Sequence, residues 1–268
     1  LSSLISEAVD SDKLNKLLAT KYNDAHQLNK SGAKLYRGAH SFSTGFIEIS
    51  PTKRERKSVD FDNLYTVLLS NLPSWKGWPR RSFCIIFSNN YEVADGYGGV
   101  NTNVFPENGA DIVVAPHADV VSQEAWKYID SQLRLDIDDV SNGCYFIIQK
   151  IIRKGEGHDD TYPQDVMDFF KTMLHKDYGE FIKIMNSVAT IENMKKYLFS
   201  DDNRLQDVRL AKYFAKTYNK HNGDWETFLN DLLDPIKNGY KLIKLKDLST
   251  IKHKAEMWTD AECLLVEI

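Results

Sequence analysis

The stretch WTDAECLLVEI, residues 258–268, places two acids directly before a short apolar run. A run as short and apolar as residues 263–266 predicts a buried strand. Side chains alternate between the two faces of a strand, so Asp260 and Glu262 are expected to point to the same side. Acids at strand ends are also common as solvated edge residues, and the spacing alone does not separate that reading from a paired-carboxylate site.

Composition places the chain among ordinary globular proteins. Its 268 residues include 42% hydrophobic and 27% charged residues, with a net charge of −4, which predicts one large domain or two modest ones. The three cysteines lack CxxC spacing, which indicates buried thiols and argues against a disulfide framework or a cysteine-rich zinc site. Because the chain shows neither a membrane span nor a signal-peptide core, we expect it to act in the cytoplasm or as an effector delivered into a target cell, with no membrane partner.

The order of predicted elements indicates an α+β fold. Helical periodicity covers residues 3–28, after which short strands alternate with small helices up to residue 115. The pattern then becomes mostly helical, with one strand-like segment at residues 144–152. We therefore predict a catalytic sheet domain formed by residues 1–120 and 241–268, and a mostly helical insertion formed by residues 121–240.

Polar residues also follow two earlier predicted strands. Arg37 follows the segment KLY, and Ser88 follows the apolar segment CIIF. Together with Asp260-Ala261-Glu262 before its own strand, these residues resemble the Arg-Ser-Glu signature of the toxin-type mono-ADP-ribosyltransferases. The segment VADGY, residues 93–97, resembles the A-x-x-aromatic segment that follows the serine in that family. The resemblance covers residues 30–115 and 240–268.

The resemblance implies both a fold and a reaction. The fold would be an ADP-ribosyltransferase-like split β-sandwich of two small sheets, with an N-terminal helix and, in this chain, a large helical insertion. The reaction would transfer ADP-ribose from NAD, used as a substrate, to a macromolecular acceptor, with NAD hydrolysis as a side activity. A protein is the favoured acceptor, and nothing in the sequence indicates a nucleic acid.

The chemistry of the signature residues suits cleavage of the bond between nicotinamide and ribose. Glu262 would stabilise the positive charge that the ribose acquires in the transition state. Arg37 would bind the paired phosphates through its forked guanidinium. Ser88 would orient the catalytic carboxylate, and Asp260 would take a proton from the acceptor nucleophile.

Further NAD contacts are implied next to these residues. Gly38 and Asn89 adjoin Arg37 and Ser88 and would line the NAD site with them, while Tyr97 or Tyr91 would stack on the nicotinamide ring. The modified residue stays open, because arginine-modifying members of the family carry Glu at the position of the first acid, where this chain has Asp.

Two other function classes remain as alternatives. The segments PHAD, residues 116–119, and GHDD, residues 157–160, combine His and Asp and could hold a divalent metal in a hydrolase. Neither has the i, i+4 spacing of a helical metal site, so solvated loops are the favoured interpretation and we predict no metal ligands. The second alternative is a non-catalytic interaction protein on the same scaffold.

Overall fold

The structure is a computed structural model, and it describes residues 2–57, 63–96, 98–116, 140, 143–148, 168–169, 172–197, 214, 217 and 220–268. The chain divides into two compact units. The sheet unit comprises residues 1–55, 77–125 and 239–268, and the helical unit comprises residues 56–76 and 126–238. Residues 56–76, which the sequence analysis placed with the sheet, group with the helical segments.

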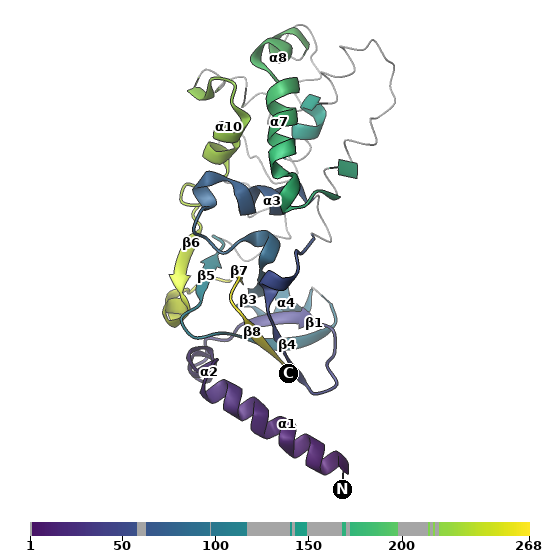
Figure 1. Ribbon diagram of the computed structural model, residues 1–268. Coiled ribbons are helices and arrows are strands. Elements are labelled where there is room, and N and C mark those ends of the chain that lie inside the picture. The colour runs from purple at the N-terminus through teal and green to yellow at the C-terminus, as the bar shows by residue number, and fades with distance from the viewer. Residues whose placement is uncertain are drawn as a thin grey trace. The chain divides into compact units, whose positions relative to one another are not determined.

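Eight antiparallel strands form the sheet unit in the order β2-β8-β4-β1-β3-β7-β5-β6 (Figure 1). The strands are β1 (Tyr36–Ala39), β2 (Phe46–Ile49), β3 (Ile85–Ser88), β4 (Val100–Pro106), β5 (Asp111–Val114), β6 (Lys241–Lys244), β7 (Glu256–Thr259) and β8 (Cys263–Glu267). The mixture of helices and strands confirms the expected α+β class. The strands expected around Arg37, Ser88 and residues 263–266 are present as β1, β3 and β8, whereas β7 was not predicted.

A narrow seam divides this sheet into two four-stranded halves. The strands β1 and β3 meet through a single residue pair, Tyr36 with Ser88, whereas β1 pairs with β4 through four residues and β3 with β7 through four. The halves are therefore β2-β8-β4-β1 and β3-β7-β5-β6. The ladder is nevertheless continuous, so the structure has one sheet with a narrow junction in place of two separate small sheets.

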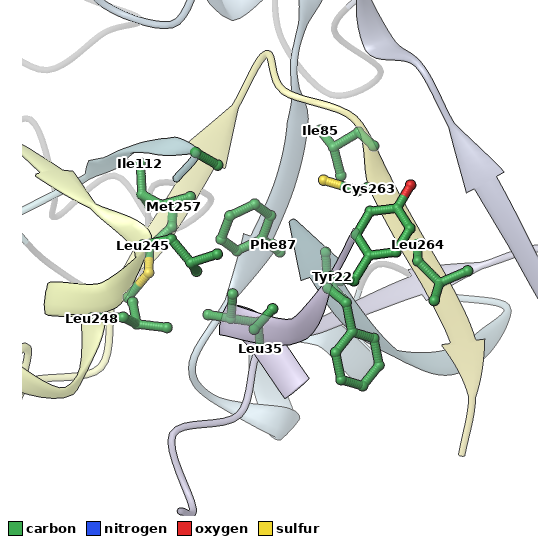
Figure 2. Packing of buried hydrophobic residues seen from close by; sticks show 14 of the residues in the cluster. Tyr22, Leu35, Ile85, Phe87, Ile112, Leu245, Leu248, Met257, Cys263 and Leu264 are labelled. Atoms are coloured by element: carbon green, nitrogen blue, oxygen red, sulfur yellow. The ribbon is translucent and has the colours of Figure 1, made fainter. Parts of the chain in front are cut away.

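Two helices precede the sheet: α1 (Ser2–Ala19) and α2 (Asn23–Lys30). The sequence analysis predicted helical structure over residues 3–28, and the structure interrupts it at residues 20–22. Buried side chains from this connection and from the strands form one core, in which Phe87 lies among Leu35, Leu245 and Met257 (Figure 2). Tyr22 is fully buried in the same core, so the turn between the helices is anchored on the sheet.

Short helices complete the sheet unit. They are α4 (Tyr91–Asp95) and the 3-10 helices η1 (Pro51–Lys53), η3 (Arg81–Phe83) and η6 (Leu245–Thr250). The helix α4 follows Ser88 and contacts β1, β3 and β4. It follows the strand end without a long loop, so polar residues of the β3 end and of α4 share one region.

Helices and aromatic side chains build the described part of the helical unit. Its elements are α3 (Leu64–Asn71), η2 (Pro73–Trp75), η4 (His175–Asp177), α7 (Tyr178–Val188), α8 (Ile191–Tyr197) and α10 (Trp225–Leu232). Phe214 stacks on Trp225 with ring centroids 4.4 Å apart, and Phe228 meets both rings edge-on. The predicted strand at residues 144–152 is wrong where it can be checked, because residues 143–148 are helical. Within the described helices, none is long and apolar enough to cross a membrane.

Candidate functional site

The acids that opened the sequence analysis lie in the crossing from one half of the sheet to the other. Thr259 ends β7, which pairs with β3 and β5, and Cys263 begins β8, which pairs with β2 and β4. Residues 260–262 connect these two strands, which do not pair with each other. The segment therefore holds the terminal strands to opposite halves of the sheet.

Glu262 belongs to a charged cluster at the start of β8. Its carboxylate accepts a hydrogen bond from the Lys21 ammonium, which also lies 3.3 Å from the Glu48 carboxylate. The bond from Lys21 lowers the pKa of Glu262 from its usual value. All three charged side chains are more than a third exposed, and Asp260 is half-buried beside them in the chain. This cluster connects the α1–α2 turn to the sheet.

The strand register separates Glu262 from Ser88. Tyr36 pairs with Ser88 on one side and with Asn103 on the other, and Asn103 pairs with Val266. Glu262 precedes Val266 by four positions (266 − 262), and three strand spacings separate β8 from β3. At ~3.3 Å per residue and ~4.8 Å per strand, the two Cα atoms are roughly 20 Å apart. Ser88 therefore does not orient Glu262, and the structure does not bring the predicted triad together.

The acidic residue in register with Ser88 is Glu256. Tyr36 of β1, Ser88 of β3 and Glu256 of β7 are register partners in one row across three adjacent strands. Register partners of antiparallel strands share a face, and their Cβ atoms lie ~5 Å apart. Ser88 and Glu256 are both buried. The row lies at the seam, where the two halves of the sheet meet.

Hydrogen bonds join the end of β3 to the segment before β7. The Ser88 hydroxyl donates to the Ala255 carbonyl at 2.9 Å and accepts from the Asn90 amide at 3.0 Å. The Asn89 side chain donates to the His253 carbonyl at 2.9 Å, and its oxygen accepts from the Ala255 amide at 2.8 Å. Three of these bonds fix the backbone just before Glu256, at His253 and Ala255. They also give Asn89 a structural role at a position that the sequence analysis assigned to NAD binding.

Glu256 is held by a buried arginine. The Arg81 guanidinium of η3 donates to the Glu256 carboxylate at 2.5 Å, and the two side chains are only 7% and 2% exposed. Arg81 also lies over the Trp258 ring, 4.6 Å from its centroid, and the Trp258 indole donates to the Pro79 carbonyl at 2.9 Å. Because Trp258 is two residues after Glu256 on the same strand face, carboxylate, guanidinium and indole form one layer on β7.

Arg37 spans the seam. Its guanidinium donates to the Ile86 carbonyl of β3 at 2.5 Å, and the Thr102 hydroxyl donates to the Arg37 carbonyl. As the residue after Tyr36 on β1, Arg37 starts from the opposite face of the sheet. Gly38 is buried and pairs with Asn101 of β4. Arg37 is thus one residue from the Tyr36–Ser88–Glu256 row without belonging to it.

Tyr36, the β1 member of the row, forms an aromatic pair with Tyr91. Tyr91 of α4 meets Tyr36 edge-on with ring centroids 5.5 Å apart, and its hydroxyl accepts from the Asn101 side chain at 2.9 Å. Tyr91 is 46% exposed, so its ring offers an accessible apolar surface next to Tyr36. Tyr97, the other predicted stacking residue, lies outside the described residues.

A polar groove of about 300 Å³ adjoins the same strand end. It lies where α2 leads into β1 and where η6 leads toward β7, and Asn89 contributes to it. Its lining comprises Ser31, Gly32, Ala33, Lys34, Asn89, Leu248, Ser249, Ile251 and Lys252. The lining contains two lysines and no carboxylate.

The metal alternative cannot be placed. Residues 117–119 and 157–160, which carry its His and Asp residues, lie outside the described residues. In the described ranges, no group of three or more His, Cys, Asp or Glu side chains is arranged to hold a metal ion.

Comparison with known proteins gives no further support for a family. No protein-family model matches the chain, and no curated protein or solved structure matches it either.

Sequence reasoning missed Glu256 and Arg81. A signal for Glu256 exists, because Glu256-Met257-Trp258 is also an acid directly before apolar residues. The longer apolar run after Glu262 was the stronger strand signal. Arg81 has no local signal, because its partner is 175 residues away in the sequence.

Proposed function

We propose that the protein is a mono-ADP-ribosyltransferase in which Glu256, in place of Glu262, is the carboxylate beside the reacting ribose. The observation that carries the proposal is the Tyr36–Ser88–Glu256 row. It supplies the arrangement that the family resemblance requires, a serine at a strand end next to a glutamate at the start of the adjacent strand. The seam between two four-stranded halves further supports the comparison with a sheet that is split at its NAD site.

The reaction assigns a task to each residue of the row. The glycosidic bond breaks heterolytically, nicotinamide leaves with the bonding electron pair, and the ribose becomes cation-like. A fixed carboxylate stabilises that charge in the transition state more than in the bound substrate. Glu256 supplies this carboxylate, and the hydrogen bonds of Ser88 and Asn89 fix the backbone that carries it.

The remaining contacts with NAD come from residues around the seam. Tyr91 and Tyr36 provide the aromatic surface for the nicotinamide ring. Arg37, one residue from the row, is assigned to the diphosphate, for which a guanidinium is the best matched side chain. Its bond to Ile86 also couples diphosphate binding to the seam.

Matched glutamine variants test the assignment of the carboxylate. The protein is incubated with NAD labelled in the adenylate, and both nicotinamide release and transfer of label to lysate proteins are measured. Glu256→Gln is expected to lose at least about 100-fold in both, the scale on which removing one transition-state contact acts. Glu262→Gln also removes one carboxylate, as Glu256→Gln does, and is expected to stay within about twofold of the wild type.

Folding must be measured beside activity, because Glu256 is nearly fully buried. Circular dichroism and urea unfolding show whether each variant is folded at the assay temperature. A folded Glu256→Gln variant with wild-type nicotinamide release would rule out the assignment. A wild-type protein that neither binds NAD by calorimetry nor releases nicotinamide would rule out the transferase itself.

A further inference from the structure

The residue two positions before the proposed catalytic carboxylate restricts the acceptor. In the family resemblance, that position carries an acid that takes a proton from the acceptor nucleophile. Before Glu256 it is occupied by Lys254. An ammonium group donates protons and does not accept them. From this we propose that the acceptor of ADP-ribose is a carboxylate of an acidic protein segment, an inference that rests on the proposed function.

The charges around the strand end favour an anionic acceptor. Three consecutive exposed residues lie just before β7: Lys252, His253 and Lys254. Lys34, which is also exposed, lies two residues before β1 and lines the polar groove together with Lys252. The acidic group facing them in the described ranges is Glu92, whose carboxylate lies 3.3 Å from the Lys254 ammonium. That pair is largely exposed on both sides, so solvent screens it and it neutralises little of the rim.

The polar groove beside this rim has matching chemistry. Its two lysines, two serines and one asparagine are hydrogen-bond donors, and its lining has no carboxylate. Lys252 already donates to the Ser249 carbonyl at 2.7 Å, so one cation is held over the groove by its own backbone. An approaching carboxylate is attracted there, whereas a guanidinium or ammonium is repelled.

The lining also favours a protein over a nucleic acid. Single-stranded nucleic acids bind by combining a cationic groove with aromatic side chains on which bases stack. The groove contains three aliphatic side chains, Ala33, Leu248 and Ile251, and no aromatic one. An acidic peptide needs only the cations, the donors and a little apolar surface.

The chemistry balances without a general base. The carboxylate oxygen forms the bond to the anomeric carbon of the ribose, and the bond to nicotinamide breaks with its electron pair leaving on nicotinamide. The negative charge of the acceptor cancels the positive charge of the nicotinamidium, and no proton is released. A hydroxyl, amine or guanidinium acceptor must lose a proton, for which Lys254 is unsuited. The product is a glycosyl ester.

Competing acceptors with the same label distinguish these possibilities. The full chain is incubated with labelled NAD and one of three probes: a glutamate-rich peptide, an arginine-rich peptide or a 5′-phosphorylated single-stranded DNA. We expect label on the glutamate-rich peptide at least tenfold above the other two, and its loss on treatment with neutral hydroxylamine, which cleaves esters. Preferential labelling of either other probe, or a label that resists hydroxylamine, overturns the inference.

A charge variant tests the role of the rim, with a matched surface lysine as control. Lys254→Gln is expected to lower the ratio of peptide transfer to NAD hydrolysis about fivefold, the scale of one exposed charge pair acting with its neighbours. Lys246→Gln, an exposed lysine on η6, is expected to leave that ratio unchanged. An unaltered ratio in Lys254→Gln removes the rim from acceptor selection. Nicotinamide release that persists with every peptide unlabelled leaves the proposed function intact and refutes the acceptor, whereas absent release refutes both.

Discussion

The pair of Arg81 and Glu256 allows a direct test of the layer on which the proposed site depends. Both side chains are at least 93% buried, and their closest atoms are 2.5 Å apart. Removing one partner leaves an uncompensated buried charge, which typically costs about 3–5 kcal/mol. Removing both with residues of similar volume is often neutral or stabilising. The single variants Arg81→Met and Glu256→Met should therefore each be strongly destabilised, and the double variant should be close to the wild type.

Urea unfolding gives the coupling energy of the pair. Unfolding of the four proteins is followed by tryptophan fluorescence. Trp258 contributes to this signal, because it is buried against the Arg81 guanidinium in the folded protein. We expect the summed loss of unfolding free energy in the two single variants to exceed the loss in the double variant by at least about 3 kcal/mol. Independent sites would agree within ~0.5 kcal/mol. Additive effects within that smaller range would show that the two charges are solvated, and would refute the buried layer.

The same four proteins separate stability from chemistry. If Glu256 contacts the reacting ribose, the double variant stays inactive although its stability is restored. A double variant that is stable and active would leave the pair as a purely structural contact. The comparison thus removes the ambiguity that attaches to a single substitution at a buried acid.

Three further predictions concern other parts of the molecule. Lys21→Met should lower the free energy of unfolding by about 0.2–1 kcal/mol, because the cluster is partly exposed. The pKa of Glu262 is lower in the folded protein than its unfolded value of 4.5, so this carboxylate stabilises the fold above pH 4.5, and that stabilisation is lost as the pH falls below 4.5. This pH dependence should weaken in the variant when its unfolding is measured from pH 7 to 3. Gly99→Ala should cost about 2–3 kcal/mol in urea, because Gly99 has φ +84° and an added Cβ would lie 2.2 Å from a carbonyl oxygen of β1; the control Gly98→Ala, with open space around it and φ +75°, should cost about 1 kcal/mol. Asp224→Ala should lower the free energy of unfolding by about 1 kcal/mol, because the Asp224 side chain caps the start of α10 by accepting a hydrogen bond from the Thr227 amide at 2.7 Å. The helix content measured by circular dichroism checks this prediction.

Alternation and apolar runs in the sequence were sufficient to predict most of the sheet. The strands β3 and β8 are nearly continuous apolar runs; β3 is buried throughout, and β8 is buried over its first three residues. The strand β7 could not be recognised in the same way, because a glutamate begins it and a threonine ends it. Both are buried only because partners from distant segments satisfy them, Arg81 for Glu256 and the Asp111 carbonyl for the Thr259 hydroxyl. A pattern confined to neighbouring residues contains no information about such partners.

The wrong strand at residues 144–152 has a related cause. Cys144, Ile147 and Ile148 are fully buried, and a short buried run has the same composition in a helix as in a strand. Local periodicity therefore identifies that a segment is buried, and the surrounding packing decides which element it forms.

The same limit explains why the proposed carboxylate is Glu256, six residues before Glu262 (262 − 256). The two glutamates begin consecutive strands, and both precede apolar residues. What separates them is the crossing at residues 260–262, which sends β8 to the outer side of β4 while β7 stays beside β3. Glu256 and Glu262 are close together in the sequence, whereas in the sheet only Glu256 lies at the seam. Any carboxylate that acts together with Ser88 must begin a strand paired with β3, and in the described sheet that requirement selects β7.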